Sequence, residues 1–173
     1  MLLAAALGIG LGLLLILAIA RWGPPVEQHA ALRSEDPELS PEALEELVRA
    51  LAGGLGLEVV FLARGTEGIV EATLRDPRPM AGGRLLLRAT PVLTRGRLDA
   101  PAVLELADAV RGDASLGKGV LIALAGFTDE ARSAAAAASA ALELYDGPGL
   151  LALAREVIPE HAEDLRRYRG ISP

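Results

Sequence analysis

Residues 2–20 form an unbroken apolar stretch, LLAAALGIGLGLLLILAIA, without one charged or strongly polar side chain. A helix of that length measures about 29 Å at 1.5 Å per residue, close to the ~30 Å hydrocarbon core of a bilayer. Arg21 and Trp22 follow it and are typical of a membrane interface, and Gly23-Pro24-Pro25 then ends the helix. We therefore predict a transmembrane helix over residues 1–22.

A cleaved signal peptide is the alternative, because Ala18-Ile19-Ala20 resembles a small-x-small cleavage site. Two observations favour the anchor: no Lys or Arg precedes the apolar stretch, and the stretch exceeds the ~7–15 apolar residues of a signal peptide. The first basic residues, Arg21 and Arg33, follow the segment. By the positive-inside rule we expect a single-pass protein of the cell membrane with its C-terminal domain in the cytoplasm.

The chemistry of the remaining chain is limited by its composition. It has no cysteine, which excludes disulfides, thiolate metal sites and cysteine nucleophiles, and its two histidines lie far apart in sequence. After residue 21 the chain carries 16 basic and 23 acidic residues. This negative charge disfavours DNA as a partner unless a local basic patch exists, and it leaves a protein partner open.

Residues 23–39 are polar, contain prolines and show no periodicity, so we interpret them as a linker. Ser40-Pro41 then has the N-cap and N1 residues of a helix, which continues with an apolar residue every three or four positions. Three strands are predicted to follow it: 57–63, 68–74 and 84–90. Residues 69–74 alternate between two faces, with Glu71 on one face and Val70 on the other.

A second helix is predicted after Asp99, and the apolar run 120–125 is typical of a strand covered on both faces. A helix starting after Thr128, a short strand, and a last helix complete a domain over residues 40–158, and residues 159–173 read as a charged tail. Three strands in a meander, a crossover helix and a further strand predict an α/β sandwich with a mixed central sheet.

Two stretches, KGVLIALAGFTDEARSAA and ALELYDGPGLLALARE, resemble the second half of the Mrr-like restriction-endonuclease domain of the PD-(D/E)xK nuclease superfamily. The resemblance covers about residues 41–157 and is most specific over Lys118–Leu151. It implies the αβββαβ core of these nucleases, which agrees with the element order above. It also implies cleavage of DNA with the help of Mg²⁺.

In the family, an acid at the end of the second strand and a Gln/Glu-x-Lys motif on the third strand hold the metal and assist it. Alignment backwards from Gly126-Phe127-Thr128 places Arg88-Ala89-Thr90 at that motif. A guanidinium accepts no hydrogen bonds and cannot bind Mg²⁺, and Thr90 lacks the charge of a lysine. Glu71 or Asp76 could stand in for the acid, either as a residual metal ligand or, for Glu71, as an ion-pair partner of Arg88.

Two further residues are candidates for contact with a nucleic-acid backbone: Lys118, before the apolar strand, and Thr128, at a helix start. A solvated turn and simple helix capping explain them equally well.

The predicted function is a membrane-anchored Mrr-like protein, DNA-binding or DNA-cleaving by resemblance, with impaired catalysis and no cofactor unless an active site retains Mg²⁺. One alternative is a non-catalytic, membrane-tethered module for protein interaction or assembly. The other is an active Mg²⁺-dependent endonuclease with a rearranged site.

Overall fold

The computed structural model describes residues 38–79, 82–91, 96–168 and 170–171. Residues 36–173 form one compact unit. The predicted transmembrane helix over residues 1–22 and most of the predicted linker lie outside the described residues. In the part that is described, no helix has both the length and the apolar character needed to cross a bilayer.

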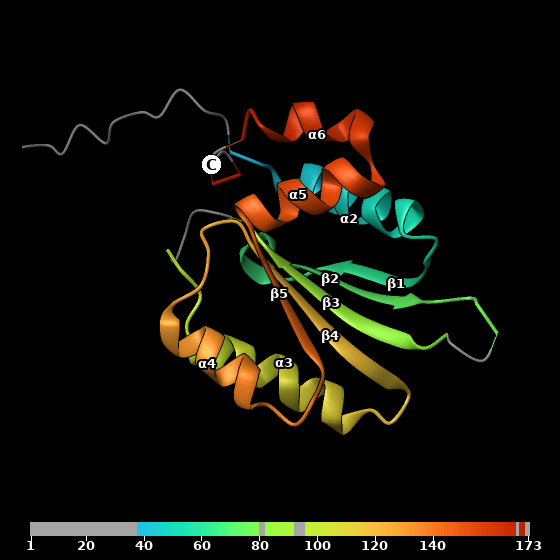
Figure 1. Ribbon diagram of the computed structural model, residues 1–173, viewed down its shortest axis with the longest axis vertical. Coiled ribbons are helices and arrows are strands. Elements are labelled where there is room, and N and C mark those ends of the chain that lie inside the picture. The colour runs from blue at the N-terminus through green and yellow to red at the C-terminus, as the bar shows by residue number, and fades with distance from the viewer. Residues whose placement is uncertain (1–37, 80–81, 92–95, 169, 172–173) are drawn as a thin grey trace, which may run out of the picture. The chain divides into compact units, whose positions relative to one another are not determined.

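Five strands form one sheet in the order of the chain (Figure 1). They are β1 (Glu58–Arg64), β2 (Val70–Arg75), β3 (Arg84–Thr90), β4 (Leu116–Ala123) and β5 (Leu142–Asp146). The contacts of β1 with β2 and of β2 with β3 are antiparallel, whereas those of β3 with β4 and of β4 with β5 are parallel. The predicted mixed sheet is therefore confirmed.

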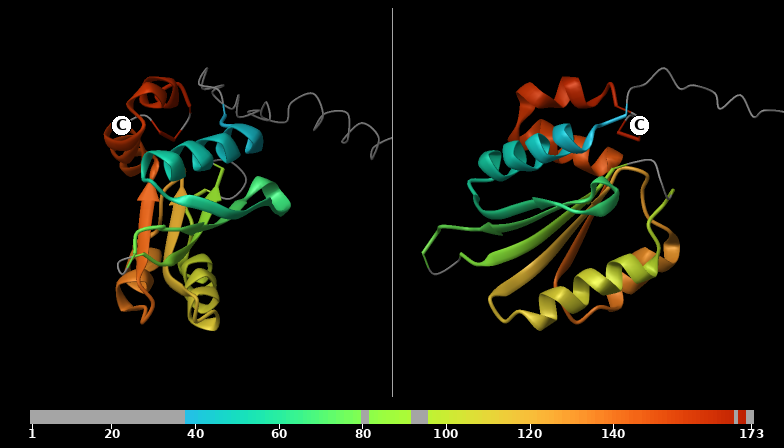
Figure 2. Two further views of the ribbon diagram at one scale, coloured as in Figure 1. Left: turned by 90° about the vertical axis from the view of Figure 1, so that its right-hand side faces the viewer. Right: turned by 180° about the vertical axis from the view of Figure 1, so that it is seen from behind.

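Helices cover both faces of the sheet (Figures 1 and 2). On one side, here called the α2 face, lie α2 (Pro41–Gly54), α5 (Gly147–Val157) and α6 (Pro159–Leu165). On the other, the α3 face, lie α3 (Ala100–Gly112) and α4 (Asp129–Ala137). The order α2-β1-β2-β3-α3-β4 is the αβββαβ core that the sequence predicted.

Each face has its own hydrophobic core. Helix α2 begins at its predicted cap, because the Ser40 hydroxyl accepts a hydrogen bond from the Ala43 amide at 3.1 Å. Its apolar stripe packs on the alternating buried residues of β2 and on the odd-numbered residues of β3, such as Leu87. Leu86 and Leu121 point the other way, into the core beneath α3 and α4. The even-numbered residues of β3 thus belong to the α3 face.

The C-terminal segment differs from its prediction. Helix α5 ends at Val157, and Pro159 begins the separate helix α6, which was not predicted. Ala162, Leu165 and Ile171 are buried in the core of the α2 face. The described residues of the predicted charged tail (159–173), namely 159–168 and 170–171, are therefore part of the folded domain.

A close backbone contact holds this segment at the start of α5. A Cβ atom added to Gly147 would lie 1.5 Å from the carbonyl oxygen of Gly170, which leaves no room for a side chain. Gly147 is buried, and Ile171 beside it is fully buried. The glycine thus lets the C-terminal segment approach the helix closely enough to bury its last apolar side chain.

Candidate functional site

The second half of β3 presents two polar side chains to the α3 face. Leu87 and Ala89 are buried on the α2 face, so Arg88 and Thr90 project from the opposite side of the strand. In the β2–β3 register Glu71 lies directly opposite Arg88. The alternation predicted for β2 therefore places the acid and the guanidinium on the same face, as neighbours.

Arg88 is held between two carboxylates. Its Nη2 and Nε atoms donate to Oε2 of Glu71 at 2.9 and 3.2 Å, and its Nη1 lies 3.5 Å from Oε2 of Glu105 on α3. The side chains of Arg88 and Glu71 retain 23% and 39% of their exposure, whereas Glu105 is 74% exposed. The Glu71–Arg88 pair is thus half-buried, and the contact with Glu105 is open to solvent.

A pocket of about 230 Å³ adjoins this pair at the C-terminal end of β3. Its charged and polar lining consists of Glu67, Arg88, Thr90, Asp99 and Glu105. Among the described lining residues, three are carboxylates and one is a guanidinium, and Arg88 already contacts two acids. The described lining therefore does not form a cationic site for a phosphate group.

Asp76, the other candidate acid, lies elsewhere. Glu71 is near the start of β2, and Asp76 follows the end of the strand, so about 17 Å of extended chain separates them. Arg78 binds both carboxylate oxygens of Asp76, with its Nε 2.9 Å from each, and these hydrogen bonds lower the pKa of Asp76. The two candidate acids therefore do not converge on one site.

The donor set of this region does not fit Mg²⁺. Within the described ranges, no group of three or more His, Asp or Glu side chains is arranged to hold a metal ion. Mg²⁺ requires an octahedron of oxygens, usually including one or two carboxylates. The Glu71 carboxylate instead holds the cation Arg88, and the neighbouring Thr90 offers only a neutral hydroxyl.

The two candidates for nucleic-acid contact lie at opposite ends of β4. Lys118 is near its start and contacts Oε1 of Glu143 through Nζ at 2.5 Å. Thr128 follows the other end of the strand and caps α4, with its hydroxyl accepting from the Ala131 amide at 3.2 Å. At least ~16 Å of strand separates the two, so they do not form a single contact surface.

Sequence reasoning missed a second polar pocket, of about 490 Å³, at the C-terminal ends of β4 and β5. Arg132 lies over the Phe127 ring, 5.6 Å from its centroid, and donates to Oδ2 of Asp146 at 2.8 Å. Oδ1 of Asp146 accepts from the Gly149 amide at 3.0 Å and caps α5. The Asp-Gly-Pro sequence at 146–148 is a helix-start signal that could have identified this cap.

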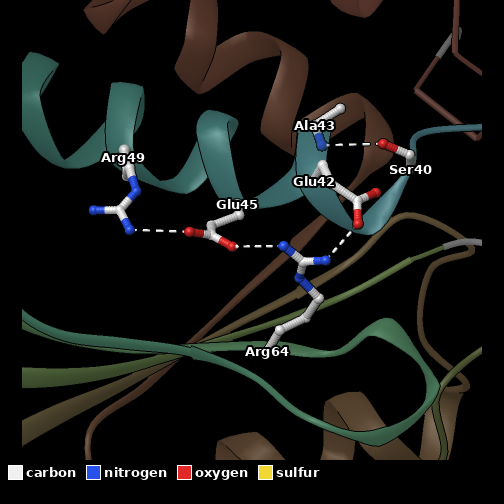
Figure 3. Close-up of polar contacts among 6 residues, drawn as sticks. All are labelled: Ser40, Glu42, Ala43, Glu45, Arg49 and Arg64. Atoms are coloured by element: carbon white, nitrogen blue, oxygen red, sulfur yellow. Dashed lines mark hydrogen bonds and ion pairs between the residues drawn. The ribbon is translucent and has the colours of Figure 1, made fainter.

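Two acids of α2, Glu42 and Glu45, form ion pairs on the other side of the sheet. Figure 3 shows Arg64 of β1 between Glu42 and Glu45, with Glu45 also bound to Arg49. The distances are 3.2 Å from Glu45 to Arg64 and 2.9 Å from Glu45 to Arg49, and these hydrogen bonds lower the pKa of Glu45. These acids therefore brace α2 against β1 and do not join Glu71.

Comparison with known proteins gives one family and two solved structures. The family model described as "Restriction endonuclease" (Mrr_cat) matches residues 37–154. The chain is similar to EndoMS in its apo form, with 21% identity, a TM-score of 0.42, and 61% of this chain and 44% of that one covered. It is also similar to the MspJI restriction endonuclease in complex with a 27-mer oligonucleotide, with 16% identity, a TM-score of 0.47, and coverage of 70% and 29%. The chain thus spans less than half of either protein. No curated protein matches it.

Proposed function

Because the chain belongs to the Mrr-type restriction endonuclease family, we propose that it carries this nuclease fold on a membrane anchor and is impaired in Mg²⁺-dependent DNA cleavage. One observation carries the proposal: the guanidinium of Arg88 contacts the only carboxylate, Glu71, that β2 directs to the α3 face beside β3.

The impairment follows from the positive charge of Arg88 and from its lack of lone pairs that could bind a metal ion. Where the family pattern has a Gln/Glu-x-Lys motif, Arg88 contributes a permanent positive charge and no acceptor. A metal ion at Glu71 would have to displace Arg88 and then stand beside the displaced guanidinium. Thr90, at the lysine position, provides no charge to stabilise the phosphate that is being cut.

Charge also disfavours tight DNA binding. The described lining of the pocket beside Arg88 has three carboxylates, and the chain carries 23 acidic against 17 basic residues. DNA binding driven by phosphate contacts would need cations gathered on one surface. In the described part, the ion pairs of Arg88, Lys118 and Arg132 already engage basic side chains with acids.

A second candidate function is a membrane-tethered protein-interaction module. Val60 and Phe61 on the edge strand β1 keep 46% and 55% of their exposure. Exposed apolar residues on an unpaired sheet edge are a common basis for protein contacts. This reading shares the fold and the anchor with the first, and it differs only in what the domain binds.

The deciding experiment is cleavage of supercoiled plasmid DNA with Mg²⁺, Mn²⁺ or EDTA. We compare the native chain, a Glu71→Ala variant, and an Arg88→Gln/Thr90→Lys variant that restores the family motif. We expect no metal-dependent nicking by the native chain. Nicking that disappears in the Glu71→Ala variant would refute the impairment and would identify a rearranged active site.

DNA binding is measured separately by fluorescence anisotropy of a labelled duplex between 50 and 300 mM salt. A binding constant that falls steeply with salt would support a DNA-binding module. Weak binding without such a slope would favour the protein-interaction reading.

The anchor requires its own test. We expect the full chain to stay in the membrane fraction after carbonate extraction, and a chain lacking residues 1–22 to leave it. The intact mass of the membrane-bound protein distinguishes the anchor from a cleaved signal peptide, because cleavage after Ala20 would remove the apolar stretch. Protease treatment of sealed vesicles then tests whether the domain faces the cytoplasm.

A further inference from the structure

We draw no further inference here: the strongest candidate, the polar pocket at the C-terminal ends of β4 and β5 where α4 and α5 begin, has a described lining in which two arginines are balanced by two aspartates, and nothing in the structure shows what would bind there.

Discussion

Replacing Arg88 should destabilise the domain through Glu71, and a double-mutant cycle measures this directly. The cycle consists of Arg88→Met, Glu71→Gln and the double variant, each compared with the parent. Methionine keeps much of the length of the side chain and removes the charge, and glutamine keeps the shape of the glutamate. The coupling free energy then reports the interaction of the two charges.

The magnitude follows from the geometry. Two unit charges about 4 Å apart attract by about 4 kcal/mol at an effective dielectric constant of about 20, and by about 1 kcal/mol in water. Arg88 and Glu71 keep 23% and 39% of their exposure, so the pair lies between these limits. Ordering the two side chains opposes the attraction. We expect a coupling free energy of about 1–2 kcal/mol.

The assay is urea unfolding of residues 36–173, which contain the complete described core. Arg75→Met and Glu58→Gln form the matched control cycle, because this pair joins β1 and β2 with 57% and 49% exposure. Its coupling should be at most about 0.5 kcal/mol and should fall further in 1 M salt. A coupling for Arg88 and Glu71 no larger than that of the control would refute the reasoning.

Three further changes have clear expected outcomes. Gly147→Ala should lower the unfolding midpoint and expose the C-terminal segment to carboxypeptidase, because its Cβ would collide with the Gly170 carbonyl; unchanged digestion would contradict this. The pKa of Asp146 is lowered in the folded state, mainly because its carboxylate accepts a hydrogen bond from the Gly149 amide. The folded protein therefore binds fewer protons there, and the stability that this supplies above about pH 4 is lost as the pH falls through the folded pKa. In the Asp146→Asn variant, the free energy of unfolding measured in urea should fall less steeply as the pH drops below 4. An unchanged dependence on pH would contradict this. Thr128→Ala should cost about 1 kcal/mol through loss of the α4 cap, with Thr128→Ser as the tolerated control, and equal stability of all three proteins would rule out the cap.

Much of the fold could be predicted because it is encoded locally. The alternation of Val70 and Glu71 predicted which residues of β2 lie on each face, and Ser40-Pro41 predicted the start of α2. The structure confirms both. The C-terminal segment was misread because its charged residues outnumber its apolar ones. Burial of Leu165 and Ile171 depends on a partner surface that lies elsewhere in the chain.

The candidate site was predictable only in part. The ion pair of Glu71 and Arg88 was one of two readings of the sequence, and the strand register places the two residues opposite each other. Local patterns could not show that Asp76 lies at the far end of β2, or that Lys118 and Thr128 lie at opposite ends of β4. These separations depend on how the strands run in the sheet, and the spacing of residues along the sequence does not predict that.

The amino-acid sequence by itself determined the order of the elements, the inward faces of the strands and the motif residues at positions 88–90, because side-chain periodicity and caps act over a few residues. Only the tertiary structure decided which charges meet and that the C-terminal segment is part of the core. Pairing of strands and packing of helices join residues that are distant in the chain, and the free energy of each contact depends on all its neighbours.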